Sequence, residues 1–138
     1  MATSFSKVNS FVEAVAEKVH NLGSDTLKLA FTNTAHTPTW TQLSDLTLAD
    51  GTPANLDSIT LTVSSSAQTS GTYKLVIADK TCTATGAVGP FRYIYIYNDS
   101  ASNDELIGYY DYGSAISLVS GDTFTVDFSA DDGVLTIA

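Results

Sequence analysis

Cysteine is almost absent from this chain of 138 residues, and Cys82 is the only one. No disulfide can form within the chain, so its fold must be held together by packing. Charged residues are also few, at 15%, whereas 43% of the residues are hydrophobic. That balance argues against disorder, and the length suffices for one domain with a sizeable core. We therefore expect residues 1–138 to form a single domain.

Basic residues are scarce as well. Six Lys and Arg stand against 15 Asp and Glu, which gives a net charge of −9, and no basic residue follows Arg92. An acidic protein is repelled by phosphate backbones and anionic lipid headgroups, so neither nucleic acid nor a membrane surface is an expected partner. The acidic residues either keep the surface solvated or form a face that docks on a basic partner.

Long apolar runs are missing too. No stretch approaches the roughly 18 consecutive apolar residues that span a bilayer. The opening MATSFSKVNSF contains no apolar segment of signal-peptide length. On this basis we expect synthesis in a cytoplasm, without export by a standard signal.

One helical pattern is present, at residues 9–22. Ser10 or the residue before it can cap the helix, and Gly23 is the expected stop. Apolar residues recur at i, i+4, i+8 and i+11, which places them on one helix face: Phe11, Val15, Val19 and Leu22.

From residue 26 onwards the hydrophobic period changes to two, which is typical of half-buried strands. Turn residues divide this part into roughly eight short strands between residues 26 and 138. Residues 91–97, FRYIYIY, form the strongest strand and are apolar or aromatic on both faces, so we expect them at the centre of a sheet. The patterns predict a mostly β fold, an antiparallel β-sandwich or jelly-roll-like domain with one N-terminal α-helix.

The residue types that carry catalysis or bind metals are scattered. His20 and His36 are the only histidines, and neither pairs with Cys82 at a spacing that zinc sites use. The loop at residues 98–105 is rich in oxygen donors, but it lacks the spacing of a calcium loop, so an ordinary turn is the preferred interpretation. No nucleophile motif is present. We expect a protein that is not an enzyme and that has no catalytic residue, metal or cofactor.

Aromatic side chains alternate along residues 91–97. One face of this strand and its neighbour is therefore expected to carry a row of tyrosines: Tyr93, Tyr95, Tyr97, Tyr109 and, as a further option, Tyr112. Three interpretations stay open: a cross-strand cluster that holds the sheet together, a protein interface, and a surface that stacks sugars.

Four stretches resemble small structural proteins of tailed bacteriophages. They are FVEAVAEKVHNLGSDTLKL at 11–29, VSSSAQTSGTYKLVI at 63–77, AVGPFRYIYIYND at 87–99 and LIGYYDYGSAISLVSGDTFTVD at 106–127. Some proteins of this kind are capsid decoration, or cement, proteins. The resemblance implies a virion protein, made in the bacterial host cytoplasm, that binds the major capsid protein on the outer capsid surface and stabilises the head. It also implies a homo-oligomer, expected to be a homotrimer whose copies gain avidity.

Two other functions remain alternatives: a tail or head–tail connector component, and a carbohydrate-binding adsorption module. For a protein interface the candidates are Phe5, Trp40, Tyr93 and Tyr95. Phe5 and Trp40 are large apolar groups outside the clearest strand pattern, and Trp40 lies in a long irregular stretch at residues 33–57. Tyr93 and Tyr95 belong to the expected tyrosine row.

Overall fold

The computed structural model describes residues 4–138. In chain order the elements are β1 (Phe5–Lys7), α1 (Phe11–Ala16), β2 (Leu27–Thr32), the short 3₁₀ helix η1 (Leu43–Asp45), β3 (Val63–Thr69), β4 (Thr72–Ile77), β5 (Lys80–Thr83), β6 (Val88–Asn98), β7 (Leu106–Leu118), β8 (Thr123–Val126) and β9 (Leu135–Ile137). The protein is mostly β with one short helix near its N-terminus, as the sequence predicts. Strand β1, which precedes the helix, was missed because it has only three residues.

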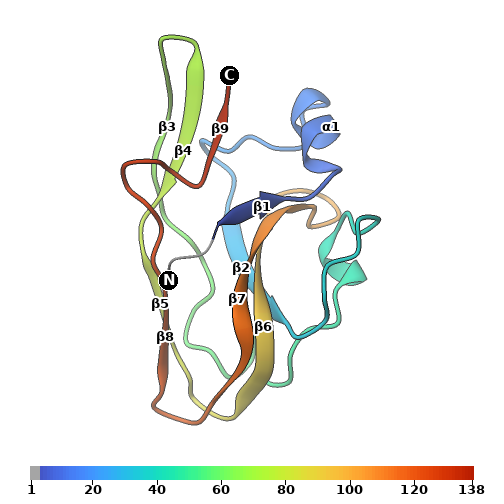
Figure 1. Cartoon of the computed structure of the whole chain (residues 1–138), viewed down its shortest axis with the longest axis vertical. Helices are drawn as coiled ribbons and strands as arrows, with labels where there is room; N and C mark the ends of the chain where they lie inside the picture. Colours follow the sequence, from blue (N-terminus) through green and yellow to red (C-terminus); the bar gives the residue numbers. More distant parts are fainter. Residues whose placement is uncertain (1–3) are drawn as a thin grey trace.

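The strands form two layers (Figure 1). One layer is a four-stranded antiparallel sheet in the order β1-β7-β6-β2. The other contains the three-stranded sheet β3-β4-β9 and the two-stranded sheet β5-β8. Only two residues separate β4 from β5, so these small sheets continue one another along the molecule. This arrangement agrees with the expected β-sandwich.

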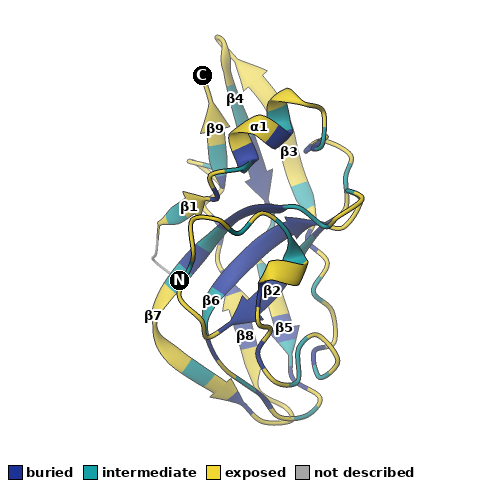
Figure 2. Ribbon diagram, turned by 90° about the vertical axis from the view of Figure 1, so that its right-hand side faces the viewer, coloured by how far each residue is buried: buried dark blue, intermediate teal, exposed yellow. Residues whose placement is uncertain are grey.

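Strand β6 lies between β7 and β2 and is covered on both faces, as the pattern FRYIYIY predicts. Ile94 and Ile96 lie on the face that meets the second layer, and both are fully buried. Tyr95 lies on the opposite face and is fully buried as well. The dark blue band of β6 in Figure 2 shows how completely this strand is enclosed.

Three phenylalanines join the two layers. Phe31 in β2 and Phe91 in β6 meet nearly edge to face, with ring centroids 5.0 Å apart. Phe124 in β8 reaches across from the second layer and lies 5.2 Å from Phe91. Edge-to-face pairs of this kind add to the free energy gained by burying the rings.

The helix is shorter than expected. It was predicted over residues 9–22 with its stop at Gly23, but α1 ends at Ala16. Lys18 adopts a left-handed conformation with φ of 67°. The backbone N–H of Val19 then donates to the carbonyl of Ala14, and that of Lys18 to Val15. This six-to-one and five-to-two pattern is a Schellman stop, here built on a lysine where glycine is usual.

Strand β7 continues through residues 115–118 beyond an irregular segment. The register shifts between the pairs Phe91↔Ile116 and Tyr93↔Asp111. Residues 112–115 bulge out of the ladder and are exposed. Gly113, with φ of 94°, and the Asp111 carboxylate that accepts its N–H at 2.8 Å shape this bulge.

Gly108 in β7 provides a test of sheet packing. A Cβ at this position would lie 2.6 Å from the Ser6 carbonyl oxygen and still closer to the Phe5 ring. We expect Gly108→Ala to lower the free energy of unfolding by roughly 1–3 kcal/mol through overpacking, measured by urea denaturation. In a Phe5→Ala background the loss should be smaller, because one of the two clashing groups is gone. Equal losses in both backgrounds would contradict this role of the Phe5 ring.

Candidate functional site

The candidate site is a cluster of aromatic side chains on the outer face of the four-stranded sheet. We call it the aromatic patch. It combines three strand residues with two from the loop that follows β2 and lies over this face (Figure 2). Its members are Tyr93, Tyr95, Tyr109, His36 and Trp40.

The strand residues reach the patch through sheet register. Tyr95 in β6 stands opposite Tyr109 in β7, and Tyr93 lies two residues along the same face. The Tyr95 and Tyr109 rings are stacked, with centroids 5.1 Å apart. Tyr95 is fully buried, whereas Tyr93 and Tyr109 are partly exposed. Of the predicted row of tyrosines, Tyr95 and Tyr97 therefore belong to the core, whereas Tyr93 and Tyr109 reach the surface.

The loop residues close the patch from above. Thr32 at the end of β2 anchors the loop by donating its hydroxyl to the Thr47 carbonyl at 2.6 Å. His36 stacks on Tyr109 at 4.6 Å between ring centroids. Trp40 meets His36 edge to face at 5.7 Å and stays partly exposed. The indole is thus held in place by ring contacts while part of its surface faces solvent.

A hydrogen bond fixes His36 to the sheet. Nδ1 of His36 lies 2.8 Å from the hydroxyl of Tyr95. Burial lowers the pKa of His36 below 6.5 and raises that of Tyr95 above 10. Both shifts favour the neutral forms at neutral pH, so the tyrosine hydroxyl can donate to an unprotonated ring nitrogen. The pair therefore holds the loop without introducing a charge.

An ion pair borders the patch. The Arg92 guanidinium makes two hydrogen bonds to the Asp111 carboxylate, 2.8 Å from Nε to Oδ1 and 3.0 Å from Nη2 to Oδ2. It also lies over the Tyr93 ring, 5.3 Å from its centroid. The hydrogen bond from Arg92 lowers the pKa of Asp111. Both side chains are about 40% exposed, so this pair orients polar groups at the surface more than it stabilises the fold.

The structure brings together three of the four residues that the sequence singled out. Trp40, Tyr93 and Tyr95 belong to the aromatic patch. Phe5 does not, because it lies on the other face of the sheet, where its ring is 5.4 Å from that of Tyr110. Tyr112, offered as a further member of the tyrosine row, bulges away from it and approaches Phe124 instead.

Sequence reasoning missed His36 as a member of this cluster. Its position four residues before Trp40 in an irregular stretch gives no periodic signal. Only the path of the loop over the sheet brings it to Tyr95 and Tyr109. In combination, the patch offers aromatic faces, hydroxyl and indole tips and a paired arginine, which are the groups that protein interfaces favour.

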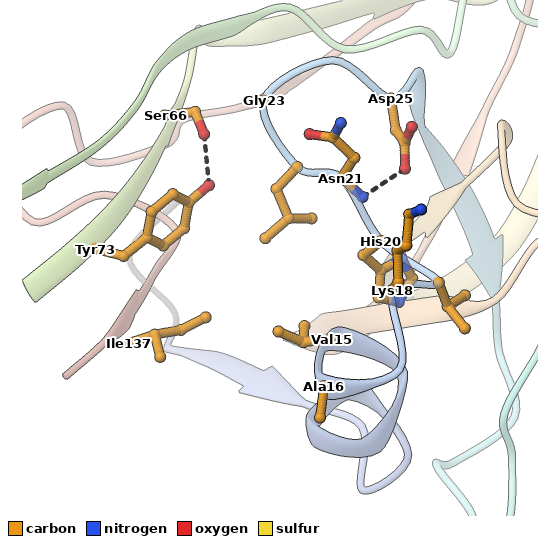
Figure 3. A pocket seen from close by; sticks show the side chains of 12 residues that line it. Val15, Ala16, Lys18, His20, Asn21, Gly23, Asp25, Ser66, Tyr73 and Ile137 are labelled. Carbon is orange, nitrogen blue, oxygen red and sulfur yellow. Dashed lines mark hydrogen bonds between the residues drawn. The ribbon is translucent and has the colours of Figure 1, made fainter.

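A hollow, separate from the aromatic patch, lies between α1 with its following turn and the β3-β4-β9 sheet (Figure 3). It has a volume of about 570 Å³. Its walls are largely apolar and include Val15, Leu22 and Ile137, while Tyr73 donates or accepts a hydrogen bond with Ser66 at 2.8 Å. None of the residues predicted for a protein interface lines it.

His20, at the edge of this hollow, belongs to a buried polar cluster. The Asn98 side-chain amide is 3.0 Å from Nδ1 of His20 and donates to the Asp25 carboxylate at 2.7 Å. Nε2 of His20 is buried without a hydrogen-bond partner among residues 4–138. Burial lowers the pKa of His20, and the carboxylates of Glu105 and Asp25 oppose this effect less strongly. The histidine is therefore kept neutral by its surroundings.

Cys82 is fully buried in β5. Its Sγ lies 3.3 Å from the Ser58 carbonyl oxygen, and burial raises the pKa of the thiol to about 11. A thiol of this kind stays protonated and unreactive at neutral pH. Its environment is that of a structural cysteine in the core.

Within residues 4–138, no three His, Cys, Asp or Glu side chains come together as metal ligands would. In the same part of the chain, no helix has the length and hydropathy of a transmembrane segment. Comparison with protein-family models, curated proteins and solved structures finds no significant match. The candidate site therefore rests on the geometry described above.

The neutral His20 predicts a pH effect on stability. Because its pKa is lowered by folding, the unfolded chain binds a proton below pH 6.5 that the folded protein resists. The free energy of unfolding should fall as the pH drops from about 7.5 to about 5.5, measured by urea denaturation. In His20→Asn the loss should be shallower. Identical pH slopes for the two proteins would contradict this assignment; His36 is present in both.

Proposed function

We propose that this protein is a non-enzymatic capsid decoration protein of a tailed bacteriophage. In this proposal it binds the major capsid protein on the outer surface of the head and stabilises the shell. Two observations of different kinds support it. Four stretches of the sequence resemble those of phage structural proteins. The aromatic patch has the composition of a protein-binding surface.

The aromatic patch is the observation that carries the binding part of the proposal. Trp40, Tyr93 and Arg92 are partly exposed side chains of the types that most often dominate binding free energy. They are held by ring stacking and hydrogen bonds, so little conformational freedom is lost when a partner docks. A rigid aromatic surface of this kind suits repeated binding to identical subunits.

The net charge of −9 is compatible with this role. An acidic protein is repelled by the DNA of an infected cell, so it stays free to reach the shell. With no disulfide needed for folding, the domain can mature in a reducing bacterial cytoplasm.

The proposal predicts a high copy number. In purified virions the protein should approach the abundance of the major capsid protein, as measured by quantitative mass spectrometry. A few copies per particle would instead favour the alternative of a tail or head–tail connector component. Imaging of labelled particles separates the two outcomes, because a connector or tail label is confined to one vertex.

The proposal also predicts that substitutions in the aromatic patch lower the affinity of the protein for the capsid shell. Trp40→Ala and Tyr93→Ala should each weaken binding to shells that lack the protein by about tenfold to a hundredfold, because centrally placed Trp and Tyr side chains often contribute 2 kcal/mol or more. Tyr112→Ala is the matched control, since Tyr112 is an exposed tyrosine outside the patch. Unchanged binding by both patch variants, with folding intact, would place the interface elsewhere.

The same partly exposed rings keep a carbohydrate-binding module as a second candidate, because sugars stack on such faces. A glycan array distinguishes the two. Binding of a defined glycan that Trp40→Ala abolishes would support an adsorption module. If no glycan on the array binds, the aromatic patch is better explained as a protein interface.

A further inference from the structure

Strand β3 has one backbone edge that pairs with nothing in residues 4–138. It is an outer strand of the β3-β4-β9 sheet and forms its ladder with β4 alone. No other backbone hydrogen bond involves residues 63–69. Figure 1 shows the β3–β4 hairpin projecting beyond the four-stranded sheet, so its edge is not hidden behind the other layer.

This edge lacks the protection that the other edge strands carry. β1 and β9 have three residues each, and β5 and β8 have four each. β2 is covered by backbone hydrogen bonds from Leu61 to Leu27 and from Ala49 to Phe31. β3 has seven residues, VSSSAQT, with no charged residue and no proline, and its one bulge lies between Val63 and Ser65, at the end far from the turn. Free edges of this length normally carry a charge, a proline, a bulge or a cover along their exposed part, because they otherwise pair with another strand.

The surrounding charge favours a second copy of this chain as the pairing strand. The chain carries a net charge of −9, so two copies repel one another over most of their surfaces. The three strands β3, β4 and β9 contain a single charged side chain, Lys74. Approach through this sheet therefore brings together strands that carry no acidic side chain.

The hairpin register determines which backbone groups face the open edge. Ser70 and Gly71 form the turn of the β3–β4 hairpin, with φ values of 53° and 84°. In such two-residue turns the flanking pair, here Thr69 and Thr72, exchanges both hydrogen bonds. Because inward and outward positions alternate, Gln68 and Ser66 direct their N–H and C=O groups outward.

We propose that two copies associate through their β3 strands, paired antiparallel about a twofold axis at Ser66. Ser66 then pairs with Ser66 of the second copy, and Gln68 lies opposite Ser64, where the bulge of β3 begins. The side chains of Ser65 and Ala67 are small, so they take little room between the paired strands. The two three-stranded sheets become one continuous six-stranded sheet, in which the β3 edge of each copy is paired.

Twofold pairing differs from the threefold arrangement that the phage resemblance implies. The same contact surface is used by both copies, so the assembly closes at two. The inference rests on the strand edge and stands independently of the proposed function. The mass of the assembly in solution distinguishes two copies from three.

The first test is the mass measured by sedimentation velocity. The wild type should show a dimer of twice 14.6 kDa. Gln68→Pro should be monomeric, because proline removes an N–H at the open edge while leaving the β3–β4 ladder intact. Gln68→Ala is the matched control: like the proline variant it loses the side-chain hydrogen bond to the Gly71 N–H, but it keeps its own backbone N–H. It should remain dimeric.

The second test holds even if the proline variant fails to fold. Ser66→Cys should cross-link to itself under mild oxidation, because opposed residues at a hydrogen-bonded antiparallel pair have Cα atoms about 5.5 Å apart, within disulfide range. Cys82 is fully buried, so it should not take part in the cross-linking. Ser120→Cys, at an exposed turn, is the control that should cross-link only slowly.

Three results would overturn the inference. They are a wild type that stays monomeric or forms trimers at millimolar concentration, a folded Gln68→Pro that keeps the dimer mass, and a Ser66→Cys that cross-links no faster than Ser120→Cys.

Discussion

The burial of β6 on both faces is the constraint on which the rest of the structure depends. Ile94 and Ile96 cover one face against the second layer, and Tyr95 fills the other. Each such side chain contributes about 1.5–3 kcal/mol when it leaves water. The outer face has no second sheet to cover it, so the loop after β2 must do so. The hydrogen bond between His36 and the Tyr95 hydroxyl holds the loop on this face. Trp40, in the same loop, is thereby placed against the Tyr95 ring. The exposed aromatic surface is thus a by-product of completing the core.

Periodicity in the sequence was sufficient to predict the parts of the fold that depend on local alternation. The central position of residues 91–97 and the β-sandwich follow from it. The length of the helix did not, because the apolar spacing continues past Ala16 while the backbone of Lys18 turns left-handed. The later apolar residues, Val19 and Leu22, lie in the segment that follows α1, where Leu22 is buried and Val19 is partly buried. Their spacing therefore indicates burial, and it does not indicate a helix.

Two features of the candidate site show why sequence reasoning reached only part of it. Alternation correctly put Tyr93 and Tyr95 on one face, but it also offered Tyr112, which the bulge in β7 removes. Phe5 looked like a free apolar group because no pattern surrounded it. The sheet instead gives it Gly108 to cover, a contact between residues far apart in the chain. Bulges and glycine contacts are set by tertiary register, and no period in the sequence encodes them.

The two proposed interaction surfaces use different chemistry and different layers. In the proposed function the aromatic patch binds through side chains on the outer face of the four-stranded sheet, whereas β3 has open backbone groups at an edge of the other layer. Pairing through β3 consequently leaves the patch open on each copy. A dimer that presents two patches binds a repeating surface with an effective concentration that a monomer lacks, provided the spacing of subunits matches that of the patches. Weak individual contacts are then enough for durable attachment, which fits a patch whose central tyrosine is already committed to the core.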